Sequence, residues 1–328
     1  MRIIVDAFGG DNAPLEILKG CYDASKELGI DIVLAGNSEI IRKTASENNI
    51  DISAMEILEA SEVITMEDEP TSVVKAKADS SMAVGLKALA DGKADAFASA
   101  GNSGAVVVGA TMIVKRIKGV KRVAFAPVMP KNKGFFMLAD SGANVECRPE
   151  MINQFATMAS CYVNKVMNID KPRVGLANVG TEDHKGGPFQ HECFALLKEN
   201  KDINFIGNIE ARDFPDDAAD VIVCDGFTGN IITKLYEGVA MTLMGKIKGL
   251  FMKNLKTKLA AALILKDFKV LKKELDYNEY GGAPILGASK PVFKIHGSAK
   301  ASTVKSALRL TKAYVESGII DEIAEAVK

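Results

Sequence analysis

The chain has 328 residues, of which 48% are hydrophobic and 25% charged, and its formal net charge is −1. This balance excludes a disordered chain, and the length suits one large α/β domain or two smaller ones. No run of 18 uncharged apolar residues occurs, the N-terminus lacks the apolar core of a signal peptide, and the five cysteines form no CxxC motif. We therefore expect a cytoplasmic protein with reduced thiols and no metal site.

Short apolar runs alternate with helical patterns along the chain. Strands are expected at 3–6, 32–34, 94–98, 123–128, 135–139, 174–177, 221–224 and 292–295. Helices are expected from Pro14 onward and at 71–91, 103–116, 149–167, 188–199 and 299–316. This alternation predicts a three-layer α/β/α fold with a mostly parallel sheet, made mixed by a hairpin between 123–128 and 135–139. We expect a single catalytic domain over 1–328, with a helical excursion at 240–275.

The helical excursion is basic and amphipathic. Residues 246–273 contain nine lysines and one acidic residue, and apolar residues recur at helical spacing between 243 and 263. Such a helix is typical of an interfacial anchor, so we expect it to dock on an anionic membrane surface, bending at Gly245 and Gly249. The expected docking residues are Leu250, Phe251, Lys253 and Lys256. Two alternatives remain: the apolar stripe is a dimer interface, or the lysines receive an acidic protein.

Polar, glycine-rich segments follow the expected strands. They lie at 6–14, 99–104, 140–144, 178–187 and 225–230. Ligands of parallel α/β sheets bind beyond the carboxyl ends of the strands. We therefore expect these five segments to converge on one rim of the sheet and to form one site.

The segment SAGNSGA, residues 99–105, has the form of an anion cradle. Gly101, Asn102, Ser103 and Gly104 offer backbone N–H groups and a hydroxyl where a helix begins. The alternative is plain helix capping. A nucleophilic Ser103 is a third reading, but it needs a base that the sequence does not identify.

Three further motifs lead to weaker hypotheses. VDAFGGDNAP, residues 5–14, lacks the GxGxxG pattern of dinucleotide sites. GGAPILG, residues 281–287, resembles a P-loop, but Ala288 stands where that motif needs lysine. Cys224 is either a thiolate nucleophile or a buried structural cysteine, and its place at the end of an apolar strand favours the second role.

Six segments together resemble, in this order, the bacterial phosphate acyltransferases that act on acyl carrier protein in phospholipid synthesis. They are VDAFGGDNAP, SAGNSGA, DSGANVECRPE, GNIEARD, DGFTGNIITKLYEG and YGGAPILG. The chain departs from that family at Phe8, Ser103 and Ala211, where methionine, threonine and glycine are usual. TEDHKGG, residues 181–187, departs further, which weakens any specific role for His184.

The resemblance implies a fold akin to isopropylmalate dehydrogenase and phosphotransacetylase, and a homodimer. It implies transfer of a long-chain acyl group from acyl carrier protein to inorganic phosphate. It also implies a cytoplasmic, peripherally membrane-associated enzyme that hands acyl phosphate to a membrane glycerol-3-phosphate acyltransferase. No metal, nucleotide cofactor or nucleic-acid partner is implied.

The polar strand ends suit this reaction. Phosphate is already nucleophilic, so the site needs a cradle for phosphate and donors for the thioester oxygen. We expect Gly101, Asn102, Ser103 and Gly104 to bind phosphate. The expected catalytic residues are Lys185 as a charge partner, Asn12, Asn144 and Asn230 for orienting the carbonyl, and Asp225 for orienting a donor.

Three other functions compete with this one. They are a phosphotransacetylase that uses short acyl-CoA, a metal-dependent hydroxy-acid dehydrogenase of related fold, and a non-enzymatic scaffold that docks on membranes. The scattered arginines disfavour the dehydrogenase, and the five polar segments disfavour the scaffold.

Overall fold

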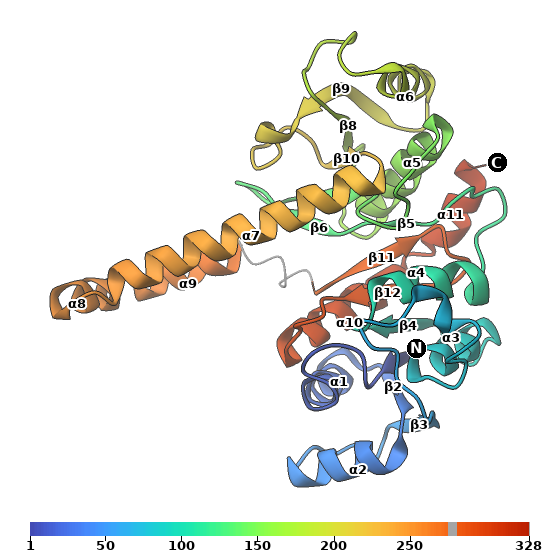
Figure 1. Ribbon diagram of the computed structural model, residues 1–328, viewed down its shortest axis with the longest axis vertical. Helices are drawn as coiled ribbons and strands as arrows, with labels where there is room; N and C mark the ends of the chain where they lie inside the picture. The colour runs from blue at the N-terminus through green and yellow to red at the C-terminus, as the bar shows by residue number, and fades with distance from the viewer. Residues whose placement is uncertain (275–280, 328) are drawn as a thin grey trace.

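The strands of the computed structural model form two mixed sheets (Figure 1). The structure describes residues 1–274 and 281–327, without the side chains of residues 269 and 271–274. The first sheet contains, in spatial order, β3 (Glu56–Glu59), β2 (Asp31–Gly36), β1 (Arg2–Asp6), β4 (Ala96–Ser99), β12 (Val292–Ile295), β11 (Gly282–Leu286) and β5 (Ala124–Phe125). The second contains β6 (Val128–Pro130), β7 (Phe135–Ala139), β10 (Val221–Val223), β8 (Arg173–Asn178) and β9 (Asn204–Glu210).

Most strand pairs in both sheets are parallel. The antiparallel pairs are β11 with β12 and with β5, and the hairpin of β6 with β7. The mostly parallel α/β class and the hairpin are therefore confirmed. The expectation of one sheet is wrong, because the run 123–128 divides at Ala126–Pro127: β5 joins the first sheet and β6 the second. Proline has no N–H to donate to a strand ladder, which favours a break there.

Helices cover both faces of the first sheet. Ile3 and Val5 of β1 pack with α1 (Leu15–Leu28) and α10 (Ala301–Glu316), and the intervening Ile4 packs with α3 (Ser81–Ala90) and α4 (Ser103–Gly109). This alternation of side chains produces the three layers. Near these helices lie α2 (Ser38–Glu47), the 3₁₀ turn η1 (Pro70–Val73) and the π-helical turn η2 (Ala110–Val114).

The second sheet is covered by α5 (Pro149–Lys165) and α6 (Pro188–Glu199) on one face, and α11 (Ile319–Ala326) packs against α5. The 3₁₀ turn η3 (Ala211–Asp213) follows β9. The core between β1, α10, α5 and β10 forms one continuous cluster, so apolar packing links the two sheets.

Several elements differ from those predicted. The expected helix 71–91 is reduced to η1 and α3, and β3, β9, β11, α2 and α11 were not predicted. β3 and β9 lie at the edges of their sheets and are partly exposed, so they lack the continuous apolar run that marks a buried strand.

Three helices form an arm that projects from the body (Figure 1). They are α7 (Gly226–Phe251), α8 (Leu255–Leu263) and α9 (Leu265–Glu274). Helix α7 begins at Gly226, because the Asp225 carboxylate accepts from the N–H of Thr228 at 2.8 Å and caps it. Its first turns pack on the second sheet through Ile232 and Tyr236, before the helix leaves the body. The chain turns at 252–254, where Asn254 caps α8, while Gly245 and Gly249 lie within α7. Residue 275 of the expected excursion and Tyr280 of the last motif lie outside the described residues.

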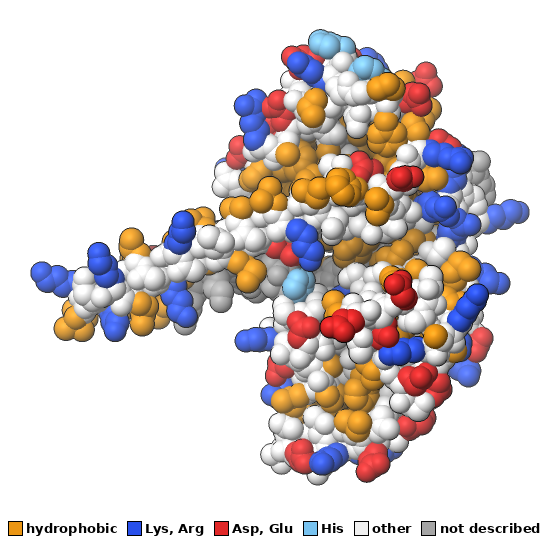
Figure 2. Space-filling view, viewed as in Figure 1, with side chains coloured by type: hydrophobic (Ala, Val, Ile, Leu, Met, Phe, Trp, Pro, Cys, Tyr) orange, Lys and Arg blue, Asp and Glu red, His pale blue; other side chains and the backbone are white. Residues whose placement is uncertain are grey.

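Hydrophobic and basic side chains share the visible face of this arm (Figure 2). Phe251 packs edge-on against Phe268 at 6.0 Å between ring centroids, which joins α7 to α9. Across the described residues, no helix is both long and apolar enough to cross a membrane.

Candidate active site

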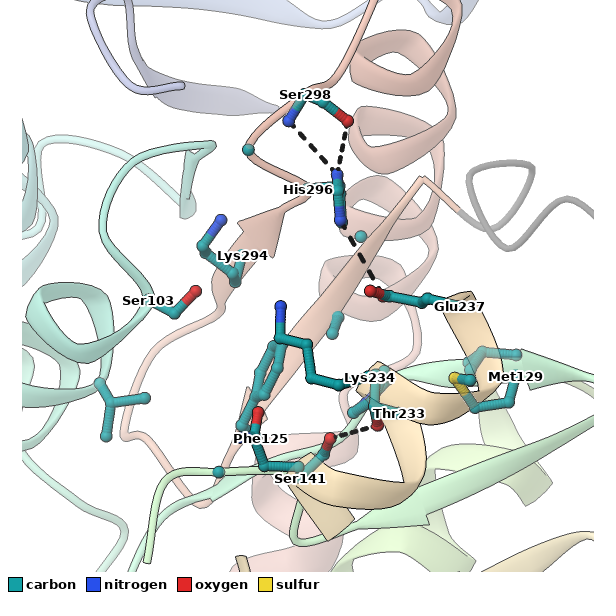
Figure 3. A pocket seen from close by; sticks show the side chains of 18 of the residues that line it. Ser103, Phe125, Met129, Ser141, Thr233, Lys234, Glu237, Lys294, His296 and Ser298 are labelled. Atoms are coloured by element: carbon teal, nitrogen blue, oxygen red, sulfur yellow. Dashed lines mark hydrogen bonds and ion pairs between the residues drawn. The ribbon is translucent and has the colours of Figure 1, made fainter. Parts of the chain in front are cut away.

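A cavity of about 440 Å³ lies between the two sheets and receives side chains from both (Figure 3). The first sheet and its connections supply Ser103, Lys294 and His296. The second sheet and α7 supply a further set: Val128, Met129, Ser141, Gly142, Asn230, Thr233, Lys234 and Glu237. Packing between the sheets therefore creates a site that neither sheet forms alone.

Two lysines make part of this cavity cationic. Lys294 lies on β12 and is only 5% exposed. Its amino group donates to the carbonyl of Ala100 at 3.2 Å and to that of Ile295. Burial lowers the pKa of Lys294 to about 8, and Asp6 acts in the opposite direction. Lys234 reaches into the cavity from α7, and Figure 3 shows both amino groups on the side where the Ser103 hydroxyl lies.

Asp6 holds the first two polar segments together. Its buried carboxylate accepts from the hydroxyls of Ser81 and Ser99, each at 2.6 Å, and from the N–H of Phe8 at 3.2 Å. Burial raises the pKa of Asp6, and these hydrogen bonds oppose the rise. A Cβ at Gly9 would lie 2.6 Å from the N of Gly101, so the two segments touch only because residue 9 is glycine.

Asn102 and Ser103 have different roles at the start of α4. The Asn102 amide oxygen accepts from the N–H of Ala105 at 3.1 Å, and its NH₂ donates to the carbonyls of Thr65 and Asp68, each at 3.2 Å. Asn102 is therefore the cap, and Ser103 is the first helical residue and lines the cavity. Gly101 and Gly104 flank these two residues.

Asp140 organises the loop that follows β7. It is fully buried and accepts from the N–H of Phe125 at 2.9 Å and from the N–H and NH₂ of Asn144 at 2.6 and 2.9 Å. Burial raises the pKa of Asp140, while Asn144 lowers it. Asn144 also donates to the carbonyl of Val123 at 2.8 Å, so its side chain is engaged inside the loop. This arrangement presents Ser141, whose hydroxyl lies 2.7 Å from that of Thr233, to the cavity.

The predicted site residues divide between two cavities, so the expectation of one rim is wrong. Ser103 and Asn230 line the first cavity, and Asn12 lies beside it with its NH₂ on the carbonyls of Ser298 and Ala299 at 3.0 and 3.2 Å. Asp225 lines a second cavity of about 490 Å³ at the ends of β8 and β10. Lys185 adjoins that second cavity, with its amino group 3.8 Å from Glu182.

Four charged or titratable residues of the first cavity escaped sequence reasoning: Lys234, Glu237, Lys294 and His296. His296 Nδ1 lies 2.9 Å from the Ser298 hydroxyl, and its Nε2 lies 3.9 Å from Glu237. Burial lowers the pKa of His296, and Glu237 opposes this effect. The sequence held one indication of these residues: Lys294 lies inside an expected buried strand, and lysine is almost never fully buried unless it is paired or functional.

Cys224 is a structural thiol. It is 4% exposed, and burial raises its pKa well above the ordinary value, with Asp225 and Asp140 adding to the rise. A reactive cysteine needs the opposite surroundings, so Cys224 is no thiolate nucleophile here.

The first cavity thus offers amino groups together with apolar side chains such as Val128 and Met129, a lining that suits an anion next to an apolar group. The fold is similar to that of a phosphotransacetylase from Streptococcus pyogenes, with a TM-score of 0.68 over 96% of this chain and 94% of that chain, at 16% identity. A branched-chain phosphotransacylase from Enterococcus faecalis V583 gives a TM-score of 0.59 over 97% of this chain and 100% of that chain, at 15% identity. At such identities the likeness shows the fold alone.

The sequence comparisons identify the family to which the chain is related. Residues 1–322 match the family described as fatty acid synthesis protein. The chain is 46% identical over 326 residues to a phosphate acyltransferase of Acetivibrio thermocellus, covering 99% of this chain and 96% of that protein. It is 40% identical over 328 residues to one of Clostridioides difficile strain 630, covering 100% of this chain and 96% of that protein.

The chain belongs to the fatty acid synthesis protein family. These matches confirm the expected enzyme class, that of the phosphate acyltransferases, and they exclude the dehydrogenase and the non-enzymatic scaffold.

Proposed function

We propose that this enzyme moves a long-chain fatty acyl group from acyl carrier protein to inorganic phosphate, giving acyl phosphate for phospholipid synthesis. The observation that carries the proposal is the composition of the first cavity. Its lining combines apolar side chains, Val107, Phe125, Pro127, Val128 and Met129, with the amino groups of Lys234 and Lys294. The apolar side chains suit an acyl chain, and the amino groups suit phosphate.

The reaction balances without an added reagent. A phosphate oxygen attacks the thioester carbonyl carbon, a C–O bond forms, and the C–S bond breaks. The proton carried by hydrogen phosphate ends on the sulfur, which gives acyl phosphate and the free carrier thiol. The protein's task is to hold both reactants in line and to stabilise the oxygen that becomes negative.

The geometry supports different roles for the predicted residues. The segment from Gly101 to Gly104 holds Ser103 against phosphate, and Asn230 orients the thioester carbonyl. Asn12 and Asn144 are positioning residues, because their NH₂ groups donate to backbone carbonyls. We place Lys185 and Asp225 outside the reacting centre, at the second cavity. Because the first cavity draws on both sheets, we propose that residues 1–328 act as one catalytic unit.

The test follows thiol release from palmitoyl-acyl carrier protein with and without inorganic phosphate. We expect release only with phosphate, together with formation of acyl phosphate. Release that ignores phosphate would identify a thioesterase instead. Palmitoyl-CoA and acetyl-CoA form the matched comparison: a preference for acetyl-CoA would assign the chain to the phosphotransacetylases.

We further propose that the arm docks the enzyme on anionic membrane, where a membrane glycerol-3-phosphate acyltransferase consumes the product. Leu255, Leu259 and Leu263 recur along α8 and are 74%, 62% and 87% exposed, with Lys256 and Lys258 among them. Leu250 is 65% exposed, and Lys253 follows in the turn. Apolar and basic side chains together are typical of an interfacial anchor.

A homodimer is the third part of this proposal. Leu235, Val239 and Met241 lie on the part of α7 nearer the body and are 64%, 57% and 69% exposed. A second subunit covering them leaves α8 at the tip free for the membrane.

A further inference from the structure

Lys294 is a buried cation that faces a cavity instead of a carboxylate. It is 5% exposed, and within the described residues its amino group donates hydrogen bonds only to the carbonyls of Ala100 and Ile295 and forms no ion pair within 4 Å. Burying an ammonium group without a counter-ion is costly in free energy. Such a group is retained where an anionic ligand completes its surroundings.

The charged groups around Lys294 come from four parts of the chain. Asp6 at the end of β1 and Asp11 in the following loop favour its charged form, and Lys234 on α7 opposes it. Glu237 on α7 and His296 after β12 line the same cavity and face each other at 3.9 Å. The Asp6 carboxylate already accepts from Ser81, Ser99 and Phe8, so it supports Lys294 from a distance.

We propose that Lys294 binds the phosphate nucleophile, with Lys234 as the second cation and Ser103 as a hydroxyl donor. The three groups come from β12, α7 and α4, and Figure 3 shows them around the same space. Lysine binds phosphate as a point charge, and two lysines match the charge of hydrogen phosphate. Phosphate is the better match than the acyl group, because the thioester carbonyl is neutral before attack.

This assignment rests on phosphate being the acceptor and not on the identity of the acyl donor. It also makes phosphate the bridge between the two sheets, since Lys294 belongs to the first and Lys234 to the helix that covers the second.

The test measures binding of inorganic phosphate alone by titration calorimetry to the wild type, K294M, K294R, K234M and K118M. Lys118 is exposed and lies outside the cavity, so K118M is the matched control. Loss of a charged hydrogen bond predicts weaker phosphate binding by about 10- to 100-fold in K294M. K294R keeps a cation and should retain most of the affinity, K234M should show a smaller loss than K294M, and K118M should bind as the wild type does. Wild-type affinity in K294M would overturn the proposal.

A kinetic experiment separates phosphate binding from other roles of Lys294. We expect the phosphate KM of K294M to rise much more than its KM for palmitoyl-acyl carrier protein. An unchanged phosphate KM with a lower kcat would assign Lys294 to the carbonyl oxygen and overturn the proposal. If the proposed acyl donor is wrong, the wild type shows no activity in the kinetic assay, while the calorimetry still decides the role of Lys294.

Two further readouts guard against a merely structural effect. K294M removes an unpaired buried cation, so we expect its melting temperature to equal or exceed that of the wild type. Loss of phosphate affinity accompanied by a lower melting temperature would indicate a structural role.

Wild-type affinity for phosphate should also fall as the pH rises through about 8, where Lys294 loses its proton, whereas K294R should not show this fall. Identical profiles in the two proteins would contradict the proposal, because the ionisation of phosphate is common to both.

Discussion

Asn102 and Ser103 are adjacent residues of one motif, and only their contacts separate their functions. From sequence alone, either side chain could cap the helix or bind an anion. In the structure the Asn102 side chain is committed to α4 and to the segment 65–68. Ser103 is left facing the cavity.

Ser103→Ala is expected to raise the phosphate KM on the order of tenfold or more, because a hydrogen bond to a charged ligand contributes about 1.5–3 kcal/mol. The KM for the acyl donor should change less. Steady-state kinetics with each substrate varied in turn provides the measurement. An unchanged phosphate KM would leave Ser103 without a role in phosphate binding.

Asn102→Ala is the matched contrast to this variant. It removes the cap and the donor to three carbonyls of the segment 65–68, so it should lower the melting temperature, whereas Ser103→Ala should not. Equal losses of stability in both variants would contradict the division of roles.

The second sheet is tied together by a charged cluster. Asp220, just before β10, accepts from the N–H of Arg173 at 2.9 Å, from its guanidinium at 3.0 Å and from Lys131 at 3.1 Å. Although burial alone would raise the pKa of Asp220, Arg173 and Lys131 lower it from 3.8 to about 2. These bonds join three strands, β6, β8 and β10, at one end of the sheet.

Asp220→Asn is therefore expected to destabilise the protein at neutral pH by about 1–3 kcal/mol, because the buried Lys131 and the partly exposed Arg173 lose a charged partner. A depressed carboxylate pKa contributes stability above the unfolded value of 3.8, and that contribution is lost as the pH falls towards 2. The difference in the free energy of unfolding between wild type and variant should thus become smaller over this pH range. Chemical denaturation at several pH values measures that free energy, and a difference that stays constant with pH would contradict the ion-pair explanation.

The arm shows how a hydrophobic stripe is divided by a turn. The sequence predicts one stripe between 243 and 263, but Phe251 packs inward on Phe268, while Leu250 and the α8 leucines face outward. Phe251→Glu would therefore disturb the arm itself and is a poor probe of docking.

Leu250→Glu and Leu259→Glu are expected to reduce flotation with anionic vesicles by about tenfold or more. Each variant removes a leucine worth about 1.5–3 kcal/mol when buried and adds a charge that the surface repels. Ile40→Glu, at an exposed isoleucine of α2 on the body, away from the arm and from the proposed dimer face, serves as the control. Analytical ultracentrifugation must accompany the assay: loss of the dimer with Leu250→Glu would assign this stripe to the subunit interface.

At the scale of the whole molecule, the first cavity lies between two packed sheets. A ligand that contacts both sheets should stabilise the folded protein as a unit. At 100 times its Kd, phosphate should contribute about 2.7 kcal/mol and raise the melting temperature by roughly 4 °C. Differential scanning calorimetry measures the melting temperature with phosphate and, as the control, with sodium chloride at equal ionic strength. An equal rise of the melting temperature with chloride would show a general salt effect.

The sequence by itself determined the α/β class, the hairpin and the basic arm, and it singled out the segment around Ser103, which lines the cavity. These features depend on local periodicity and on residues within a few positions of each other, which a linear reading captures. The resemblance of six motifs added the enzyme class, which the family comparisons confirm.

Only the tertiary structure decided how the polar strand ends divide between two cavities, and which cations join Ser103. The strands belong to two sheets, so their ends do not meet on one rim. Lys294 contacts Ala100 across 194 residues of sequence, and Lys234 enters from a helix capped by Asp225. No local pattern encodes such encounters, because they arise from the packing of apolar faces that brings distant strands and helices together.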